Sequence, residues 1–204
     1  ICRSANLRDA VEKCVTSAYG YAGQVCISLQ NLFVHRDVYE EVKGLLLKAV
    51  QKLSVGDPVD DKVVCGPLIS SSLVDKVQQM IGEAVDGGGK LLAGGEAQKN
   101  LLPPQLVEDA PTDSRLMKEE AFGPVLTLTE FDDLESLVQR LNRGRYGIHA
   151  SVFTASDEDI AVANRLEFGG IVINDAPSLR FDNLPYGGMR DSGFGREGVR
   201  YAML

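Results

Sequence analysis

Residues 31–53 read NLFVHRDVYEEVKGLLLKAVQKL, in which a short apolar run passes directly into an amphipathic pattern. The apolar run at residues 32–34 is typical of a buried β-strand. Asp37 and Glu40 have the spacing of a capping box, which predicts the start of a helix. The apolar stripe of that helix consists of Val38, Val42, Leu45, Leu46, Ala49 and Leu53. The stretch therefore predicts a strand followed by a helix, the unit from which α/β folds are built.

The same alternation continues on both sides of this stretch. Further helices are expected over residues 7–19, from Ser72 with Asp75 to glycines 87–89, from Leu134 to Gly144, and from Ser156 to glycines 169–170. Strands are expected at residues 90–93, 125–129, 151–153 and 171–173. Alternating strands and helices indicate an α/β fold with a largely parallel, buried sheet. No change of composition marks a linker, so we expect one domain over residues 1–204.

The composition excludes several classes of partner. Of the 204 residues, 44% are hydrophobic and 25% are charged, as in an ordinary globular fold. No apolar run approaches the roughly 18 residues of a membrane span, so no membrane association is expected. The formal net charge of −8 opposes binding to a phosphate backbone, so no nucleic-acid partner is expected. The chain starts at Ile1 with neither an initiator Met nor a signal peptide, and we expect a cytoplasmic domain excised from a longer protein.

The cysteines and histidines do not form a metal-binding pattern. The four cysteines are Cys2, Cys14, Cys26 and Cys65, with no C-x-x-C pair among them. His35 and His149 do not fall at zinc-site spacing from these cysteines. We therefore expect reduced thiols and no bound metal.

The region from Asn174 to Gly198 has neither helical nor strand periodicity. A long loop of this kind in an α/β domain is usually functional, because the ends of the strands present it at a crevice. Residues 193–198 spell a literal G-x-G-x-x-G. The dinucleotide fingerprint requires a strand before the glycines and a helix with a distal acidic residue after them, whereas here a loop precedes and six residues follow. We interpret residues 193–198 as a glycine-rich bend.

Cys26 is the best candidate for a reactive residue. It lies in a connection between a helix and a strand, and Gly23 before it permits a sharp turn. A buried, inert cysteine is the alternative interpretation. A Cys-His hydrolase with His149 as the base is a mechanistic alternative, although Ile27 stands where papain-like enzymes have an aromatic residue. The residues alone leave these alternatives open.

Two motifs and their order resemble one enzyme family. Gly23-Gln24-Val25-Cys26 is similar to the nucleophile motif of the NAD(P)-dependent aldehyde dehydrogenases, and Glu119-Glu120-Ala121-Phe122-Gly123-Pro124 is similar to the second signature of that family. Further counterparts are Val55-Gly56-Asp57-Pro58, Gly66-Pro67-Leu68-Ile69, Tyr146-Gly147, Pro185-Tyr186-Gly187-Gly188 and residues 191–198. The resemblance covers the whole chain and implies the catalytic domain of this family, a three-layer α/β fold with an open, largely parallel sheet and flanking helices. The tail is most similar to lactaldehyde and phosphonoacetaldehyde dehydrogenases.

The resemblance implies a role for each matching residue. Cys26 would attack the aldehyde, giving a thiohemiacetal and then a thioester, while its backbone N–H helps to bind the oxyanion. Glu120 would hold the nicotinamide ribose and Phe122 would position the nicotinamide ring. Tyr186 would line the substrate tunnel, and Arg180 would meet an anionic aldehyde or, equally, anchor its loop. Without the resemblance, Glu120 would be interpreted as a solvated acid and Phe122 as a core aromatic.

The resemblance also implies missing parts. Asn31 stands five positions after Cys26, where related sequences often carry a basic residue. The general-base glutamate, the oxyanion-hole asparagine and the dinucleotide-binding domain would lie upstream, so the cofactor could be NAD or NADP. The parent would act on a small aldehyde as a homodimer or homotetramer, and the isolated chain would be inactive. The alternative is a fragment without enzymatic function that acts only by association.

Overall fold

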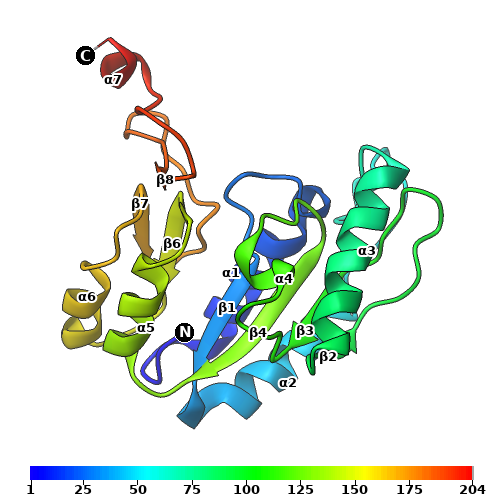
Figure 1. Ribbon diagram of the computed structural model, residues 1–204, viewed down its shortest axis with the longest axis horizontal. Coiled ribbons are helices and arrows are strands. Elements are labelled where there is room, and N and C mark those ends of the chain that lie inside the picture. The colour runs from blue at the N-terminus through cyan, green and yellow to red at the C-terminus, as the bar shows by residue number, and fades with distance from the viewer. Residues whose placement is uncertain (204) are drawn as a thin grey trace.

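The main sheet forms the centre of the molecule. The computed structural model describes residues 1–203 (Figure 1). In spatial order the strands are β1 (Asn31–His35), β4 (Val125–Phe131), β3 (Gln105–Glu108) and β2 (Lys90–Ala93). β4 pairs in parallel with both β1 and β3, whereas β2 runs antiparallel at the edge. The strand–helix alternation of the sequence thus produces a largely parallel sheet.

Helices cover both faces of this sheet. α1 (Leu7–Tyr19) and α2 (Tyr39–Val50) pack on one face, where Val34, Leu126 and Leu128 are fully buried. α3 (Ser71–Asp86) and the short α4 (Arg115–Lys118) cover the other face against Val107 and Val125. The expected α/β class, with a largely parallel sheet between flanking helices in three layers, is confirmed.

A second, smaller sheet lies beside the main one. It consists of the parallel strands β6 (His149–Val152) and β7 (Gly170–Ile173), which pack with α5 (Leu134–Asn142) and α6 (Asp157–Ala163). Backbone hydrogen bonds at the first residues connect the two sheets. The Ile1 amino group donates to the Phe33 carbonyl of β1 at 2.7 Å, and the Cys2 N–H donates to the Phe153 carbonyl at 2.9 Å.

The remainder of the chain extends away from these sheets. β5 (Tyr146–Gly147) and β8 (Met189–Arg190) form an antiparallel pair, and α7 (Val199–Ala202) is the last helix of the described residues. Figure 1 shows the region from β8 to α7 projecting from the body of the molecule. No helix within residues 1–203 is long and apolar enough to cross a membrane.

Two helix starts were predicted incorrectly. The structure places a 3₁₀ turn, η2 (Arg36–Val38), where Asp37 was expected to cap α2. The N-cap of α2 is Val38, without a side-chain hydrogen bond, so Asp37 and Glu40 form no capping box. α3 is capped by Ser70, whose side chain accepts from the Leu73 N–H at 3.2 Å, rather than by Ser72. A serine hydroxyl can cap a helix at any start that it reaches. Residues 70–72 are all serines, so the sequence offers several possible N-cap positions.

Two further differences concern the ends and number of elements. α6 ends at Ala163, and Gly170 starts β7 instead of closing the helix. β3 was not predicted, because it has polar residues at both ends. Both are buried and hydrogen-bonded: Gln105 donates to the Gly95 and Pro103 carbonyls, and Glu108 accepts from Tyr39 and Lys43. Such paired polar groups are compatible with a central strand.

Candidate active site

The Cys26 loop, defined as residues 21–30, leaves the C-terminus of α1 through a tight turn. Tyr21, Ala22 and Gly23 have φ angles of 52°, 54° and 68°, so three consecutive residues are left-handed. A Cβ atom at Gly23 would overlap the backbone carbonyl of Gly123. Glycine is therefore required at position 23 both by its φ angle and by this close approach. The turn brings the two signature motifs into direct backbone contact.

Cys26 differs from the other three thiols in its exposure. Cys26 is exposed, whereas Cys2, Cys14 and Cys65 are buried. Burial raises the pKa of Cys2 to about 11, that of Cys14 to about 12 and that of Cys65 to about 11. A thiolate is the nucleophilic form, so we expect these three buried thiols to react slowly at neutral pH. Cys26 is the one thiol of the described residues that a reagent or substrate can reach directly.

The part of the loop after Cys26 is anchored on α1. The Ser28 N–H donates to the Val25 carbonyl at 2.9 Å and closes a turn around Cys26. The Ser28 hydroxyl donates to the Ser17 carbonyl at 3.0 Å. Before Cys26, the Gln24 side-chain oxygen accepts from the Ile69 N–H at 3.0 Å. Hydrogen bonds on both sides of Cys26 therefore hold the exposed thiol on a fixed backbone.

The Glu120 segment, defined as residues 116–124, carries the second motif. Glu119 forms an ion pair with Arg115 at 3.3 Å. Glu120 is exposed and forms no ion pair within the described part of the chain, so its carboxylate is free to accept hydrogen bonds. Phe122 is half-buried with a φ angle of 59°, a left-handed conformation that is unusual for an aromatic residue. The two glutamates are thus in different situations, although the sequence presents them as neighbours.

The Gln30 side chain connects the Cys26 loop to the Glu120 segment. Its amide nitrogen donates to the Leu116 carbonyl at 2.7 Å and to the Glu119 carbonyl at 2.8 Å. Its amide oxygen accepts from the Ala121 N–H at 2.9 Å. The role of Gln30 is not visible in the sequence, because nothing in its local pattern indicates partners about ninety residues away.

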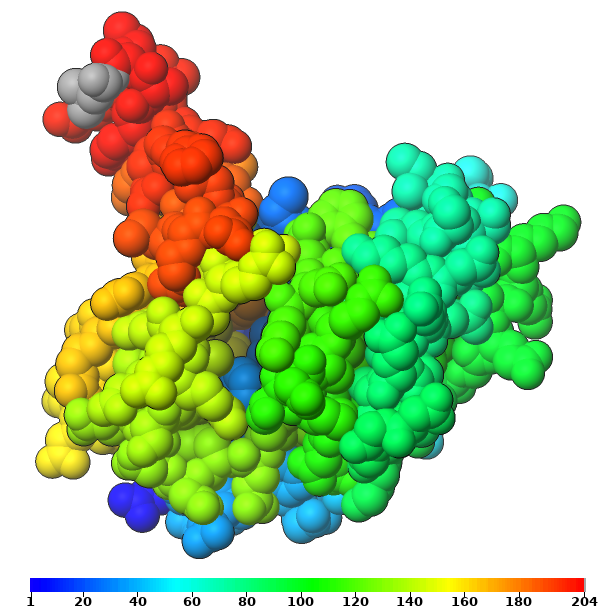
Figure 2. Space-filling model, viewed as in Figure 1, coloured from blue at the N-terminus to red at the C-terminus, as the bar shows by residue number. Residues whose placement is uncertain are grey.

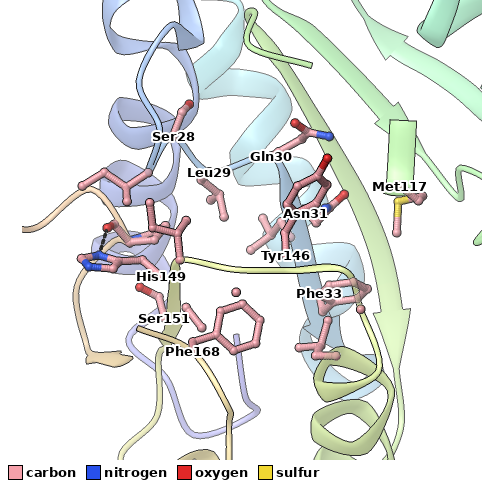
Figure 3. Close-up of a pocket in the computed structure, with 18 of the residues that line it drawn as sticks. Ser28, Leu29, Gln30, Asn31, Phe33, Met117, Tyr146, His149, Ser151 and Phe168 are labelled. Atoms are coloured by element: carbon pink, nitrogen blue, oxygen red, sulfur yellow. Dashed lines mark hydrogen bonds between the residues drawn. The ribbon is translucent and has the colours of Figure 1, made fainter. Parts of the chain in front are cut away.

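A cavity of about 920 Å³ opens between the two sheets and contains Cys26, Glu120 and Phe122 in its lining. Figure 2 shows the hollow between the yellow-green surface that includes α5 and the neighbouring green surface. Apolar side chains, among them Phe33, Leu137 and Phe168, form part of its lining. In Figure 3, Gln30 and Asn31 lie on the β1 side of the cavity, and His149 and Ser151 lie across from them. The structure thus brings three of the five predicted site residues into one cavity.

The other two predicted residues, Arg180 and Tyr186, lie in a smaller adjoining pocket of about 170 Å³ that shares His149 with the large cavity. The Arg180 guanidinium stacks on the Tyr186 ring at 4.4 Å and pairs with Glu197 at 3.7 Å. Burial is the main cause that raises the pKa of Tyr186; the nearby Cys26, Glu197 and Glu120 side chains raise it further, while Arg180 opposes them. Tyr186 is therefore within electrostatic range of Cys26.

His149 has a partner other than Cys26. Its Nδ1 contacts the Pro177 carbonyl at 2.8 Å, and its ring meets the Tyr186 ring edge-on at 5.3 Å. A carbonyl only accepts hydrogen bonds, so Nδ1 carries the proton. No hydrogen bond joins His149 to Cys26 in residues 1–203, so the geometry gives the Cys-His hydrolase no support.

Two other features singled out in the sequence have clear structural surroundings. Asn31 accepts a hydrogen bond from the Thr127 hydroxyl at 2.8 Å, so it serves to join β1 to β4. Gly193, Gly195 and Gly198 all have positive φ angles, as a glycine-rich bend requires. In the part of the chain that the structure describes, no group of three or more His, Cys, Asp or Glu side chains is arranged to hold a metal ion.

Comparison with known proteins identifies relatives over the whole chain. The sequence profile described as the Aldehyde dehydrogenase family matches residues 1–204. A lactaldehyde dehydrogenase from Methanocaldococcus jannaschii is 38% identical over 204 residues, which are 100% of this chain and 44% of that protein. A 3-sulfolactaldehyde dehydrogenase from Priestia megaterium is 33% identical over 203 residues, covering 98% of this chain and 42% of that protein.

A solved structure agrees with the fold. The glyceraldehyde-3-phosphate dehydrogenase from Methanocaldococcus jannaschii, determined in complex with NADP, superposes with a TM-score of 0.94 at 38% identity. The match covers 99% of this chain and 44% of that one. The resemblance that the two motifs indicated is thereby confirmed. The chain spans less than half the length of these relatives.

Proposed function

Since this chain belongs to the aldehyde dehydrogenase family, we propose that it supplies the cysteine nucleophile and the nicotinamide-end contacts of an enzyme that oxidises a small aldehyde to a carboxylic acid with NAD(P). The observation that carries the proposal is the shared cavity of Cys26, Glu120 and Phe122. Because the chain covers 44% of the length of such a relative, we expect the general base and the other cofactor contacts in the rest of the protein.

The residues present fit one end of a dinucleotide. Glu120 has a free, exposed carboxylate, which suits the two hydroxyl groups of a ribose. Phe122 lines the same cavity and offers a flat apolar surface for a nicotinamide ring. When bound, the cofactor supplies the hydride acceptor of the oxidation. Both contacts are at the nicotinamide end, so this chain alone leaves the choice between NAD and NADP open.

The chemistry assigned to Cys26 follows from its sulfur. The thiolate adds to the aldehyde carbon, forming a C–S bond and turning the carbonyl oxygen into an oxyanion beside the Cys26 N–H. Loss of hydride from that carbon restores the carbonyl as a thioester. Water then attacks the thioester, the C–S bond breaks, and the thiolate leaves. One water is consumed, and a carboxylate and two protons are released with the reduced cofactor.

We propose an anionic aldehyde as the substrate class. Arg180 lies beside the cavity and has a planar guanidinium suited to a carboxylate, sulfonate or phosphate. Its ion pair with Glu197 is long, at 3.7 Å, and exposed, so a substrate anion can replace it. The names of two relatives, a 3-sulfolactaldehyde dehydrogenase and a glyceraldehyde-3-phosphate dehydrogenase, describe anionic aldehydes.

Brief alkylation of the folded protein tests the assignment of Cys26. With iodoacetamide at pH 7.5, peptide mass spectrometry should find Cys26 labelled well before Cys2, Cys14 and Cys65, because only Cys26 is exposed. In the full-length protein, Cys26→Ala should reduce aldehyde oxidation by at least about 10⁴-fold, as the loss of a nucleophile does.

The matched control is Cys65→Ala, which removes a buried thiol away from the cavity and should leave the rate of oxidation within about twofold. Preferential labelling of another cysteine would contradict the assignment. A wild-type protein that neither binds NAD(P) nor oxidises aldehydes would favour a role by association alone.

A further inference from the structure

The strained backbone at Phe122 requires an explanation. A left-handed conformation is strained at a residue with a side chain, and it persists only where the surroundings hold it. The conformation matters because it sets the direction of the Phe122 ring relative to the segment that carries Glu120. The contacts that hold the Glu120 segment therefore decide where these two side chains point.

The segment is held on both sides of Phe122. After Phe122, Gly123 packs against the backbone of Gly23, and a Cβ atom at Gly123 would come within 2.8 Å of Val77. Before Phe122, the Gln30 side chain binds the carbonyls of Leu116 and Glu119 and the N–H of Ala121. Backbone packing fixes one end of the segment, and one side chain fixes the other.

Gln30 is well suited to this task. All three of its hydrogen bonds are between 2.7 and 2.9 Å, and they use both the amide nitrogen and the amide oxygen. An amide is required, because a carboxylate would repel two carbonyl oxygens and an ammonium group could not accept from Ala121. Its own backbone carbonyl accepts from the Thr127 N–H at 2.8 Å, which fixes Gln30 to β4.

Lys76 of α3 provides a second, weaker hold. Its ammonium donates to the Glu120 carbonyl at 2.8 Å. Together, Gln30 and Lys76 bind the main-chain groups of three consecutive residues, 119–121. None of these bonds involves the Glu120 carboxylate, which stays free.

We propose that Gln30 is a positioning residue for the cofactor site: it acts through the backbone of residues 119–121 to aim Glu120 and Phe122 into the cavity beside Cys26. The proposal rests on the proposed function. Gln30 lies four positions after Cys26, so the same loop that presents the thiol also sets the position of the cofactor contacts. A shift of the loop would therefore move both groups together.

The test compares Gln30→Met with wild type in the full-length protein. Methionine keeps the length of the side chain but removes the three hydrogen bonds. Calorimetric titration with NAD and NADP should show a five- to tenfold higher Kd, about the value of one or two lost hydrogen bonds. The KM for aldehyde should stay within about twofold. The Ala121 amide should exchange with deuterium faster, because its acceptor is gone.

A double-mutant cycle separates positioning from simple destabilisation. Glu120→Gln should weaken cofactor binding, and adding Gln30→Met should weaken it by less than the product of the two single effects, because Gln30 acts through Glu120. The matched surface control is Gln79→Met, which loses only a contact to Glu83 on the exposed face of α3 and should leave every constant unchanged.

If Gln30→Met does not fold, Lys76→Met at the surface of α3 provides the second arm, with the same direction and a two- to threefold effect. A wild-type Kd in Gln30→Met, or a lower melting temperature without a change in Kd, overturns the positioning role alone. A wild-type protein that binds neither cofactor overturns the proposed function, and the positioning role with it.

Discussion

The Cys26 loop and the region of residues 176–198 both border the site, but they are held in different ways. Directed hydrogen bonds and a backbone contact tie the Cys26 loop to α1, to residues 67–69 and to the Glu120 segment. The second region has mostly exposed side chains, among them Phe181, Leu184 and Phe194. At the site, a hydrogen bond between the Pro177 carbonyl and His149 anchors the start of this region, and Arg180 adds a ring stack and a long ion pair.

This difference suggests a division of roles. Groups that form and break bonds must be held within about half an ångström of their working geometry, so they belong on a rigid framework. Groups that select a substrate tolerate replacement, so they belong on a loop. Substitutions in the first region should therefore affect stability and rate together, and those in the second should affect substrate preference.

The largest effect is expected at Gly23. Gly23→Ala places a Cβ against the Gly123 carbonyl at a φ angle of 68°, and it should lower the free energy of unfolding by about 2 to 4 kcal/mol and reduce oxidation as well. Chemical denaturation and steady-state kinetics measure the two effects.

Gly20→Ala is the matched control, since the φ angle of Gly20 is −56° and nothing lies within 4 Å of the added methyl. It should be neutral or stabilising by up to about 1 kcal/mol. Equal effects at the two glycines would remove the basis of the comparison.

A smaller effect is expected in the framework beneath the site. Burial alone would raise the pKa of Glu108, but hydrogen bonds from Lys43 and Tyr39 outweigh it and hold the pKa below its ordinary value. As the pH falls, Glu108 therefore takes up a proton in the unfolded chain before it does so in the folded protein. This stabilisation is complete above about pH 4.3 and is lost below it, as the pH falls through the lowered pKa of the folded state. Glu108→Gln should lower the free energy of unfolding by about 1.5 to 3 kcal/mol at pH 7. It should also make that free energy depend less on pH in the acid range.

The matched control for Glu108 is Glu135→Gln, which breaks an exposed ion pair with Arg165 and should leave the free energy of unfolding nearly unchanged. Urea titrations of the three proteins at pH 7 and at pH 3.5 supply the comparison. A Glu108→Gln variant with the same acid dependence as wild type would show that Glu108 contributes nothing to it.

The smallest effect on stability is expected at Arg180. Its stacking on Tyr186 at a partly exposed position is worth about 0.5 to 1 kcal/mol, so Arg180→Leu should barely shift the unfolding curve. We expect the KM for an anionic aldehyde to rise about tenfold, because a charge-assisted contact is lost, while that for a neutral aldehyde changes little. Kinetics with both substrates provide an internal control. An equal rise for both aldehydes would assign Arg180 to loop anchoring.

Local patterns predicted the elements but not the contacts between them. The helix at residues 7–19 and the strand at residues 90–93 have the expected bounds, because their apolar periodicity and flanking turns are local properties. The predicted start of α2 was wrong because a 3₁₀ turn precedes the helix, and Asp37 lies within that turn instead of capping α2. β3 was missed because its burial depends on partners from α2 and from residues 95 and 103.

The same limit applies to the site. Cys26, Glu120 and Phe122 were found through two motifs of the chain, and their place in one cavity agrees with that reading. Their roles stay predictions. Gln30 was not found, because its significance lies in three partners distant in the sequence. The difference between Glu119 and Glu120 depends on Arg115, whose i,i+4 spacing to Glu119 is a local pattern that indicates the ion pair.

The contact between Gln30 and Ala121 also has a consequence for the timing of folding. The two residues are 91 positions apart, so the hydrogen bond closes a long loop. The chain loses the conformational entropy of that loop before the hydrogen bond contributes any stability. During synthesis at about 5 to 20 residues per second, Cys26 waits about 5 to 20 s before Ala121 has even been added. Throughout that interval the thiol lies on a chain without its partner segment. During that interval the surrounding redox poise, and not the folded protein, sets whether the Cys26 thiol stays reduced.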